Sequence, residues 1–211
     1  MRRDETLETR VARLYDQALP YHNFGHALET VRAGAEIVAH CREDGVPIDE
    51  DVVYYALLLH DAGYHEDHLL KGYRSKEDYS AALASTVLAE HRVPQATIDK
   101  VIAAIEATQR NATFKTNEEK AVRAADLAGL AADYVTFKSN SEKLKAEWER
   151  LNGRALSWTD WIAQTSEVVD FFLGQDIRLT RYYADEYGES VFHKRTRRNL
   201  ERLRAEKIAG Q

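Results

Sequence analysis

The sequence predicts an all-α protein. Apolar residues recur at the spacing of three and four that places them on one face of a helix, as in Ile98, Val101, Ile102 and Ile105. A second series with this spacing consists of small side chains: Ala121, Ala124, Ala125, Ala128 and Ala131. Few segments alternate apolar and polar residues over the length of a strand. The three prolines, Pro20, Pro47 and Pro94, each stand near an expected helix boundary.

The expected helices follow from these patterns in chain order. Asn23 is a good N-cap for the second helix, and the apolar run Val52–Leu59 predicts a third helix that is buried on every side. Trp158, Ile162 and Val169 place large side chains on a later one. The expected ranges are about 4–18, 24–42, 50–61, 77–91, 95–109, 117–135, 139–151, 157–173, 176–187 and 189–207. The segment Ala62–Lys76 is the longest irregular stretch, and a loop of that length in a compact domain is often functional.

Composition limits the classes of protein to consider. No apolar run approaches the ~18 residues of a membrane span, and no apolar segment follows the arginines of MRRDETLETR, so we expect no secretory signal. Cys41 is the only cysteine, so an internal disulfide cannot form and a cytoplasmic location is expected. Any metal must therefore be held by His, Asp and Glu. The net charge of −6 makes a nucleic-acid partner unlikely.

Two acidic residues stand in apolar surroundings. Asp61 follows His60 at the end of the apolar helix, where an ionised carboxylate is costly unless it is paired or bound to a metal. Asp126 lies among alanines, which leave room for an ion. The simpler interpretations are a helix cap at His60-Asp61 and a pair between Arg123 and Asp126 at i, i+3.

The stretch YHNFGHA, from Tyr21 to Ala27, contains two histidines in different settings. His26 falls in the first turn of the helix that Asn23 begins, and a ligand is best held on such a rigid element. Glu29 or Thr30 would orient its imidazole. His22 precedes the cap, from where it would reach past a metal toward a substrate.

In order along the chain, these residues resemble the H…HD…D pattern of the HD-domain superfamily of metal-dependent phosphohydrolases. His60 follows His26 by 34 residues, and Asp126 follows Asp61 by 65. The segments LLLHDAGY, KEDYSAALA, IEATQ and AADLAGLA are similar to a group of small bacterial predicted HD phosphohydrolases. The resemblance implies one HD-type helical domain over 1–211, with the metal site within about 18–135 and additional C-terminal helices over about 136–211.

The resemblance also implies roles for these residues. His26, His60, Asp61 and Asp126 would hold one divalent ion (Mn, Fe, Co, Ni, Zn or Mg), and Asp61 would also be a partner of the attacking water. YHNFGH is similar to the opening of the cyclic-nucleotide phosphodiesterase site, which makes His22 the general acid. Some HD enzymes have a glutamate three residues after the Asp, where this chain has Tyr64, and Glu77 is the expected substitute. Only His65, His68 and His91 lie between the HD pair and Asp126, which favours one metal over two.

The expected substrate is a small phosphorylated molecule, most simply a nucleotide. Lys71 and Arg74 of the long loop, together with Arg123, are the candidates for binding its phosphate, although solvated side chains are the simpler interpretation of each. The alternatives to hydrolysis are a nucleotide- or metal-binding regulatory protein without turnover, and an HD-type di-iron oxygenase. Four aromatic residues near the C-terminus are typical of either a core or a homodimer face: Trp158, Trp161, Phe171 and Phe172.

Overall fold

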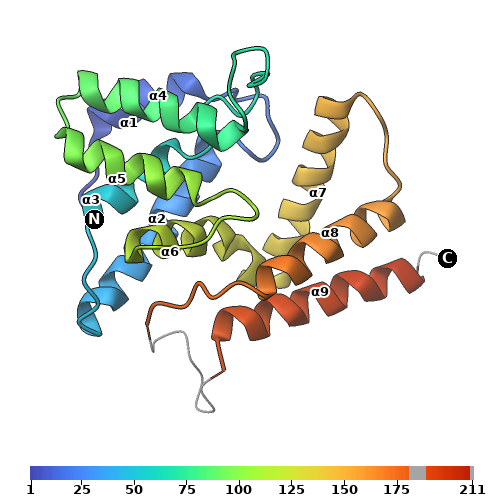
Figure 1. Ribbon diagram of the computed structural model, residues 1–211. Coiled ribbons are helices and arrows are strands. Elements are labelled where there is room, and N and C mark those ends of the chain that lie inside the picture. The colour runs from blue at the N-terminus through green and yellow to red at the C-terminus, as the bar shows by residue number, and fades with distance from the viewer. Residues whose placement is uncertain (181–188, 210–211) are drawn as a thin grey trace. The chain divides into compact units, whose positions relative to one another are not determined.

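The computed structural model describes residues 1–180 and 189–209 of the chain. Within those residues all regular structure is helical and no β-sheet is present, which confirms the all-α prediction (Figure 1). The chain divides into two compact units, Met1–Asp126 and Leu127–Gln211. The single-domain organisation, with an extension beginning at about 136, stays a prediction.

The first unit is built around a central helix. In chain order its helices are α1 (Glu5–Val11), a 3-10 turn (Ala12–Leu14), α2 (Phe24–Glu43), α3 (Glu50–Leu59), α4 (Lys76–Glu90), α5 (Gln95–Glu106) and α6 (Asn117–Asp126). Helix α3 contacts each of the other α-helices of this unit. Its residues Val52, Val53 and Ala56–Leu59 have no exposed surface. The apolar run is thus buried as expected except at Tyr55, which is half-buried, while Asp51 in the first turn is exposed.

Close packing joins the two helices that carry the histidines. Gly34 of α2 faces α3 so closely that a Cβ atom at this position would lie 2.3 Å from Cδ1 of Leu57. Any larger residue would need α2 or the Leu57 side chain to move, because cores are packed nearly as densely as crystals. The glycine therefore sets the short separation between α2 and α3, on which the approach of His26 to His60 depends.

Polar caps begin these helices where the sequence predicts. The Asn23 side chain accepts hydrogen bonds from the backbone N–H groups of Gly25 (2.8 Å) and His26 (3.3 Å). Asp49 and Ser75 cap α3 and α4 in the same way. Such caps satisfy N–H groups that have no partner within the helix.

The second unit contains α7 (Tyr134–Asn152), α8 (Trp158–Leu173) and α9 (Val191–Ala209), with Phe137, Ile162 and Leu203 in its core. Trp161 is buried and its indole N–H donates to the Ser141 hydroxyl at 2.9 Å, whereas Phe171 is 37% exposed. Packing within the unit thus accounts for Trp161 but not for Phe171.

Four predicted boundaries are wrong. The helix expected over 4–18 ends at Val11 and continues only as a 3-10 turn to Leu14. The helix expected over 117–135 ends at Asp126 and is followed by a 3-10 segment, Leu127–Ala131. The helix expected to begin at 139 begins at Tyr134, because Asp133 caps it by accepting from the Thr136 N–H at 3.1 Å. Residues 176–180, expected to be helical, are not, and the rest of that expected helix lies outside the described residues.

Among the described residues, every helix is too short or too polar to cross a bilayer.

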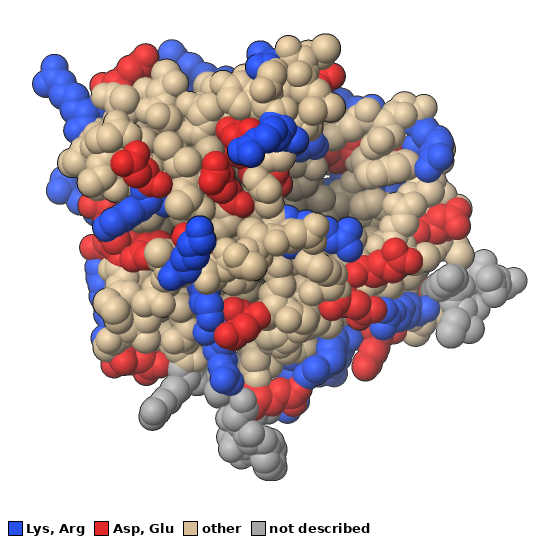
Figure 2. Space-filling view, in the orientation of Figure 1, with Lys and Arg blue, Asp and Glu red and all other residues tan. Residues whose placement is uncertain are grey.

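On the face drawn in Figure 2, acidic and basic side chains are interspersed. Such a mixed face lacks the extended single-sign patch that is typical of nucleic-acid-binding surfaces.

Candidate metal centre

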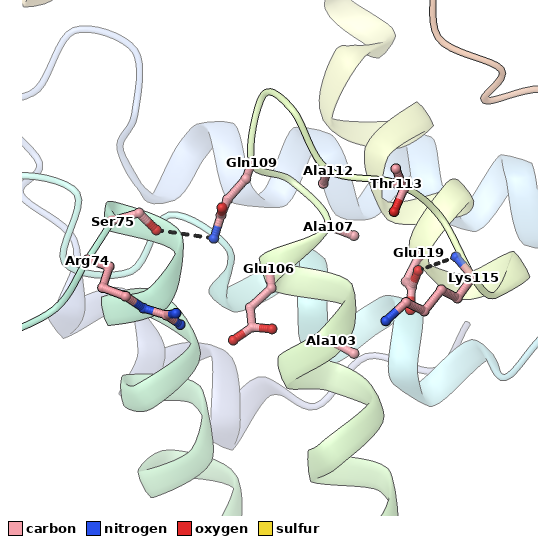
Figure 3. A pocket seen from close by; sticks show the side chains of 10 residues that line it. All are labelled: Arg74, Ser75, Ala103, Glu106, Ala107, Gln109, Ala112, Thr113, Lys115 and Glu119. Carbon is pink, nitrogen blue, oxygen red and sulfur yellow. Dashed lines mark hydrogen bonds between the residues drawn. The ribbon is translucent and has the colours of Figure 1, made fainter.

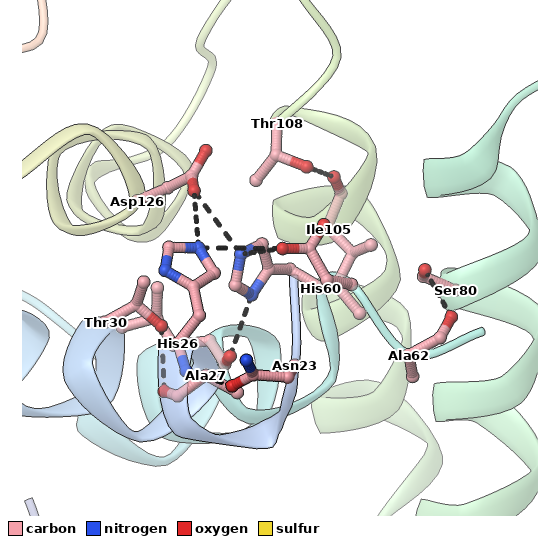
Figure 4. Close-up of polar contacts among 12 residues, drawn as sticks. Asn23, His26, Ala27, Thr30, His60, Ala62, Ser80, Ile105, Thr108 and Asp126 are labelled. Carbon is pink, nitrogen blue, oxygen red and sulfur yellow. Dashed lines mark hydrogen bonds and ion pairs between the residues drawn. The ribbon is translucent and has the colours of Figure 1, made fainter. Parts of the chain in front are cut away.

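Three of the predicted metal ligands converge in the first unit. His26 lies in the first turn of α2, His60 follows the last residue of α3, and Asp126 ends α6. One ligand atom from each of these side chains lies within 4.8 Å of the others, which is a spacing suited to one metal ion. Figure 4 shows the Asp126 carboxylate directed at both imidazole rings.

His60 is oriented by the end of its own helix. Its Nδ1 lies 2.8 Å from the backbone oxygen of Leu57. Because a carbonyl oxygen only accepts, Nδ1 carries the hydrogen, and in the neutral ring Nε2 carries the lone pair. That Nε2 lies 3.0 Å from Oδ2 of Asp61 and 3.4 Å from Oδ1 of Asp126. A metal-binding histidine is commonly fixed in this way, with its second nitrogen donating to a backbone oxygen.

His26, on α2, faces the same two carboxylates as His60. Its Nε2 lies 3.7 Å from Oδ2 of Asp61 and 3.7 Å from Oδ1 of Asp126. Thr30, which was expected to orient this ring, instead donates its hydroxyl hydrogen to the Ala27 carbonyl at 2.9 Å. Glu29 is exposed, and no contact places it against the ring.

Both Nε2 atoms are buried and lack hydrogen-bond geometry toward any partner. The His26 side chain is 6% exposed and that of His60 is 2% exposed. Buried polar atoms are rarely left without a partner, so each such atom calls for an explanation. A cation between these nitrogens and the carboxylates of Asp61 and Asp126 would satisfy all four groups, and the donor set of nitrogen and oxygen suits a divalent ion.

The electrostatics of the cluster favour a cation in the same place. Burial raises the pKa of Asp61, but the positive charge of the nearby imidazoles outweighs it and lowers this pKa to about 2. The pKa of Asp126 is also held well below its ordinary value, against burial, by His26 and His60. Burial lowers the pKa of His60, yet Asp61 and Asp126 hold it well above its ordinary value. Two ionised carboxylates whose side chains are only 15% and 20% exposed therefore need positive charge beside them, which an imidazolium or a bound cation supplies.

The turn that carries Asp61 is fixed by neighbouring elements. The Ser80 hydroxyl of α4 donates to the Ala62 carbonyl at 2.7 Å, and the Gly63 N–H donates to the Leu14 carbonyl at 3.1 Å. Gly63 has a φ of +76°, the left-handed conformation that glycine adopts without strain. These bonds hold the backbone that directly follows Asp61, whose carboxylate faces His60.

Arg123 is buried next to Asp126 and does not lie on the surface. It is 1% exposed, its Nη1 lies 3.8 Å from Oδ2 of Asp126, and its Nη2 donates to the Gln109 carbonyl. Burial lowers the pKa of Arg123, opposed by the charges of Asp126 and Glu77, so Glu77 lies close enough to affect it. The structure thus brings Arg123 near the cluster, and its i, i+3 pair with Asp126 is present. Glu77 acts on Arg123 through its charge and, within the described part of the chain, contacts none of the four ligand candidates.

His22 lies outside α2, as the sequence indicates, at the edge of the cluster. Its ring centroid lies 5.7 Å from that of His26, and its charge contributes to lowering the pKa of Asp61. The ring of Tyr64 stacks on it with centroids 3.9 Å apart and planes 17° apart. The ammonium of Lys76 lies 3.4 Å from the centroid of the same tyrosine ring.

The loop cations are bound to carboxylates of their own neighbourhood. Lys71 Nζ lies 2.6 Å from Oε2 of Glu66, and Arg74 Nε lies 3.2 Å from Oδ2 of Asp78. Neither shows a contact with the cluster. The Arg74 side chain is 86% exposed, so it is available to a ligand in solvent.

The intervening histidines also lie elsewhere. His65 Nε2 is 4.0 Å from Oε1 of Glu66, and His91 Nε2 is 2.9 Å from Oδ2 of Asp4 at the start of α1. His68 is half-buried in the long loop. Within the described part of the chain, the histidines whose ring nitrogens have the spacing of metal ligands are His26 and His60.

A polar pocket of about 480 Å³ lies between the start of α4, the end of α5 and the segment before α6 (Figure 3). Arg74, Glu106 and Lys115 are among the residues that line it, and the metal-ligand candidates are not. Gln109 connects it to the cluster: its side-chain amide donates to Ser75 Oγ at 3.3 Å, and its backbone carbonyl accepts from Arg123.

The sequence did not indicate that Tyr64 packs on His22, or that Lys76 packs on Tyr64. Tyr64 was noted only because it stands where some HD enzymes have a glutamate, and Lys76 only as the last residue of the long irregular segment. Stacking between side chains 42 positions apart leaves no periodic signal in one sequence. The proximity of Tyr64 to Asp61 in the chain was the single available indication.

Comparison with protein-family models and with curated proteins found no match to this chain. A function is therefore proposed from the chemistry of the cluster.

Proposed function

We propose that this chain is a metal-dependent phosphohydrolase of the HD type, which cleaves a nucleotide or another small phosphate mono- or diester. One observation carries the proposal: two buried imidazole Nε2 atoms without hydrogen-bond partners face the carboxylates of Asp61 and Asp126. The same residues form the H…HD…D series of the sequence.

His26, His60, Asp61 and Asp126 would hold one divalent ion. The histidine and carboxylate donors are compatible with Mn, Fe, Co, Ni, Zn or Mg. Such an ion supplies Lewis acidity, which acidifies water and polarises a phosphoryl group. A single ion is preferred because, in the described part of the chain, His65 and His91 are paired with carboxylates away from the cluster.

The side chains then divide the remaining tasks. Asp61 orients the attacking water and accepts its proton, and His22 donates a proton to the leaving oxygen. Arg123 offsets the negative charge of Asp126. Glu77, whose charge acts on Arg123, would orient a second water. Lys71 and Arg74 would bind the phosphate if the long loop closed over the substrate, which requires them to leave Glu66 and Asp78.

The first experiment is elemental analysis of the purified chain, followed by a screen of phosphate mono- and diesters with that metal added back. We expect about one divalent ion per chain and metal-dependent release of phosphate or cleavage of a diester. Asp61→Ala should abolish turnover, and Asp51→Ala, an exposed aspartate on α3, should leave it unchanged.

Three results would contradict the proposal. Full activity of Asp61→Ala would overturn the site. Two irons with visible absorption would favour the oxygenase. Tight nucleotide binding without turnover by the metal-loaded chain would favour a regulatory protein.

A further inference from the structure

The ring of Tyr64 has a neighbour on each face. His22 stacks on it at 3.9 Å between centroids, and Lys76 Nζ lies 3.4 Å from its centroid. The imidazole and the ammonium cannot share one face, since at these distances from one centroid their atoms would overlap. Tyr64 is therefore enclosed between the two, in a geometry that suits both a ring stack and a cation–π contact.

His22 needs such support because its own backbone does not provide it. It stands before the N-cap Asn23, outside α2, so helical packing does not fix its ring. A general acid acts only when its proton lies within hydrogen-bond reach of the leaving oxygen. Tyr21 and His26 meet the His22 ring edge-on, with centroids 4.9 and 5.7 Å away, whereas Tyr64 meets it face to face, at 17° between planes.

We propose that Tyr64 is a positioning residue for proton donation by His22, with Lys76 holding the tyrosine ring from its other face. This inference rests on the proposed function. In the step concerned, the oxygen of water forms a bond to phosphorus and the bond to the leaving oxygen breaks. Asp61 takes the proton of the water, and the His22 imidazolium gives its proton to the leaving oxygen.

The arrangement also restricts the substrate. A nucleobase cannot stack on Tyr64 without displacing His22 or Lys76, because both faces of the ring are covered. Recognition at this edge of the site is therefore directed to the phosphate and the leaving oxygen. A base, if the substrate has one, must bind elsewhere.

The test compares substrates whose leaving groups differ in their need for an acid. An alkyl phosphate requires protonation of its leaving oxygen, whereas 4-nitrophenyl phosphate has a leaving group that departs as the anion. Tyr64→Leu should lower kcat for the alkyl phosphate by about tenfold to a hundredfold, because part of the acid contribution is lost. For the nitrophenyl ester the loss should stay below about threefold, with metal content unchanged.

Two further variants distinguish positioning from a general structural role. Tyr64→Phe keeps the stacking ring and should restore most of the rate on the alkyl phosphate. Tyr73→Leu removes a tyrosine of the same loop whose ring contacts Tyr79, and should leave the ratio of the two rates unchanged. Equal losses of Tyr64→Leu on both substrates, or a Phe variant as impaired as the Leu variant, would overturn the proposal.

A second readout does not depend on turnover. In the metal-loaded chain, ring-current shielding by Tyr64 should move the His22 ring-proton NMR signals upfield, with assignment by the His22→Ala spectrum. The shift should persist in Tyr64→Phe, shrink in Lys76→Met and vanish in Tyr64→Leu. If no phosphate ester is cleaved, the proposed function fails, and an unshielded His22 overturns the positioning role by itself.

Discussion

His60 owes its orientation to a group that mutation cannot remove. The acceptor for its Nδ1 hydrogen is the backbone carbonyl of Leu57, in the buried last turn of α3. This bond leaves Nε2 directed at Asp61 and Asp126. The ring is therefore prepared for a metal by the helix itself rather than by a second side chain.

The two histidines of YHNFGHA should respond differently to substitution. His26→Ala removes a buried ligand, so the purified variant should contain less than about a tenth of the normal metal by elemental analysis, in line with the loss expected for a first ligand. His22→Ala should retain the metal and lose about a hundredfold in kcat, the usual contribution of a general acid. His40→Ala, at a surface pair with Glu43, serves as the control. Equal loss of metal in both variants would show that the division between them is mistaken.

The sequence predicted the ligand candidates better than their neighbours. Asp126 and the pair His60-Asp61 stood out because charged groups in apolar settings need partners. His26 stood out by its place in the first turn of its helix and by the resemblance to the H…HD…D pattern. Their convergence depends on how α2, α3 and α6 pack, and Gly34 gave no sign of that role in the sequence. The burial of Arg123 was also unforeseen, because an arginine on a helix with acidic neighbours is compatible with an exposed position as well as with a buried one.

Helix starts were predicted more accurately than helix ends. Asn23, Asp49 and Ser75 are side-chain caps, and each begins a helix at or within one residue of the expected position. The ends depend on tertiary contacts instead: α6 stops at Asp126 although the alanine spacing continues to Ala131. A helical pattern in the sequence does not show where an α-helix tightens into a 3-10 turn.

Helix α1 is attached to α3 through Glu8, and this attachment should depend on pH. Glu8 accepts from Arg3 Nε at 2.7 Å and from the Tyr54 hydroxyl at 2.9 Å. The hydrogen bonds from Arg3, opposed by burial, lower the pKa of Glu8 below its ordinary value. The stabilisation is therefore complete above the unfolded-state pKa of about 4.3 and is lost as pH falls through the lower folded-state value.

Glu8→Gln should lower the free energy of unfolding by about 1–3 kcal/mol at pH 7, because it removes a charged acceptor of buried hydrogen bonds. The difference between the variant and the unmodified chain should shrink as pH is lowered from 5 to 3. Urea denaturation followed by far-UV circular dichroism measures both values, with Glu5→Gln, an exposed position of the same helix, as the control. Parallel stability curves across this pH range would contradict the assigned role.

All four proposed ligands belong to Met1–Asp126, so metal binding should stabilise that unit. A ligand that binds only the folded state at about a hundred times its Kd adds about 2.7 kcal/mol to the free energy of unfolding. Thermal denaturation by circular dichroism should therefore shift upward when the divalent ion is added and return when a chelator removes it. His26→Ala should show no shift, and a shift of equal size in that variant would locate the ion elsewhere.

The division of the chain has a practical use in spectroscopy. The three tryptophans, Trp148, Trp158 and Trp161, all belong to Leu127–Gln211. Intrinsic tryptophan emission is thus a reporter for the half of the protein that holds none of the proposed ligands. If added metal delays the fluorescence transition as much as the dichroism transition, the two halves unfold cooperatively. If the fluorescence transition stays where it was, each half melts on its own.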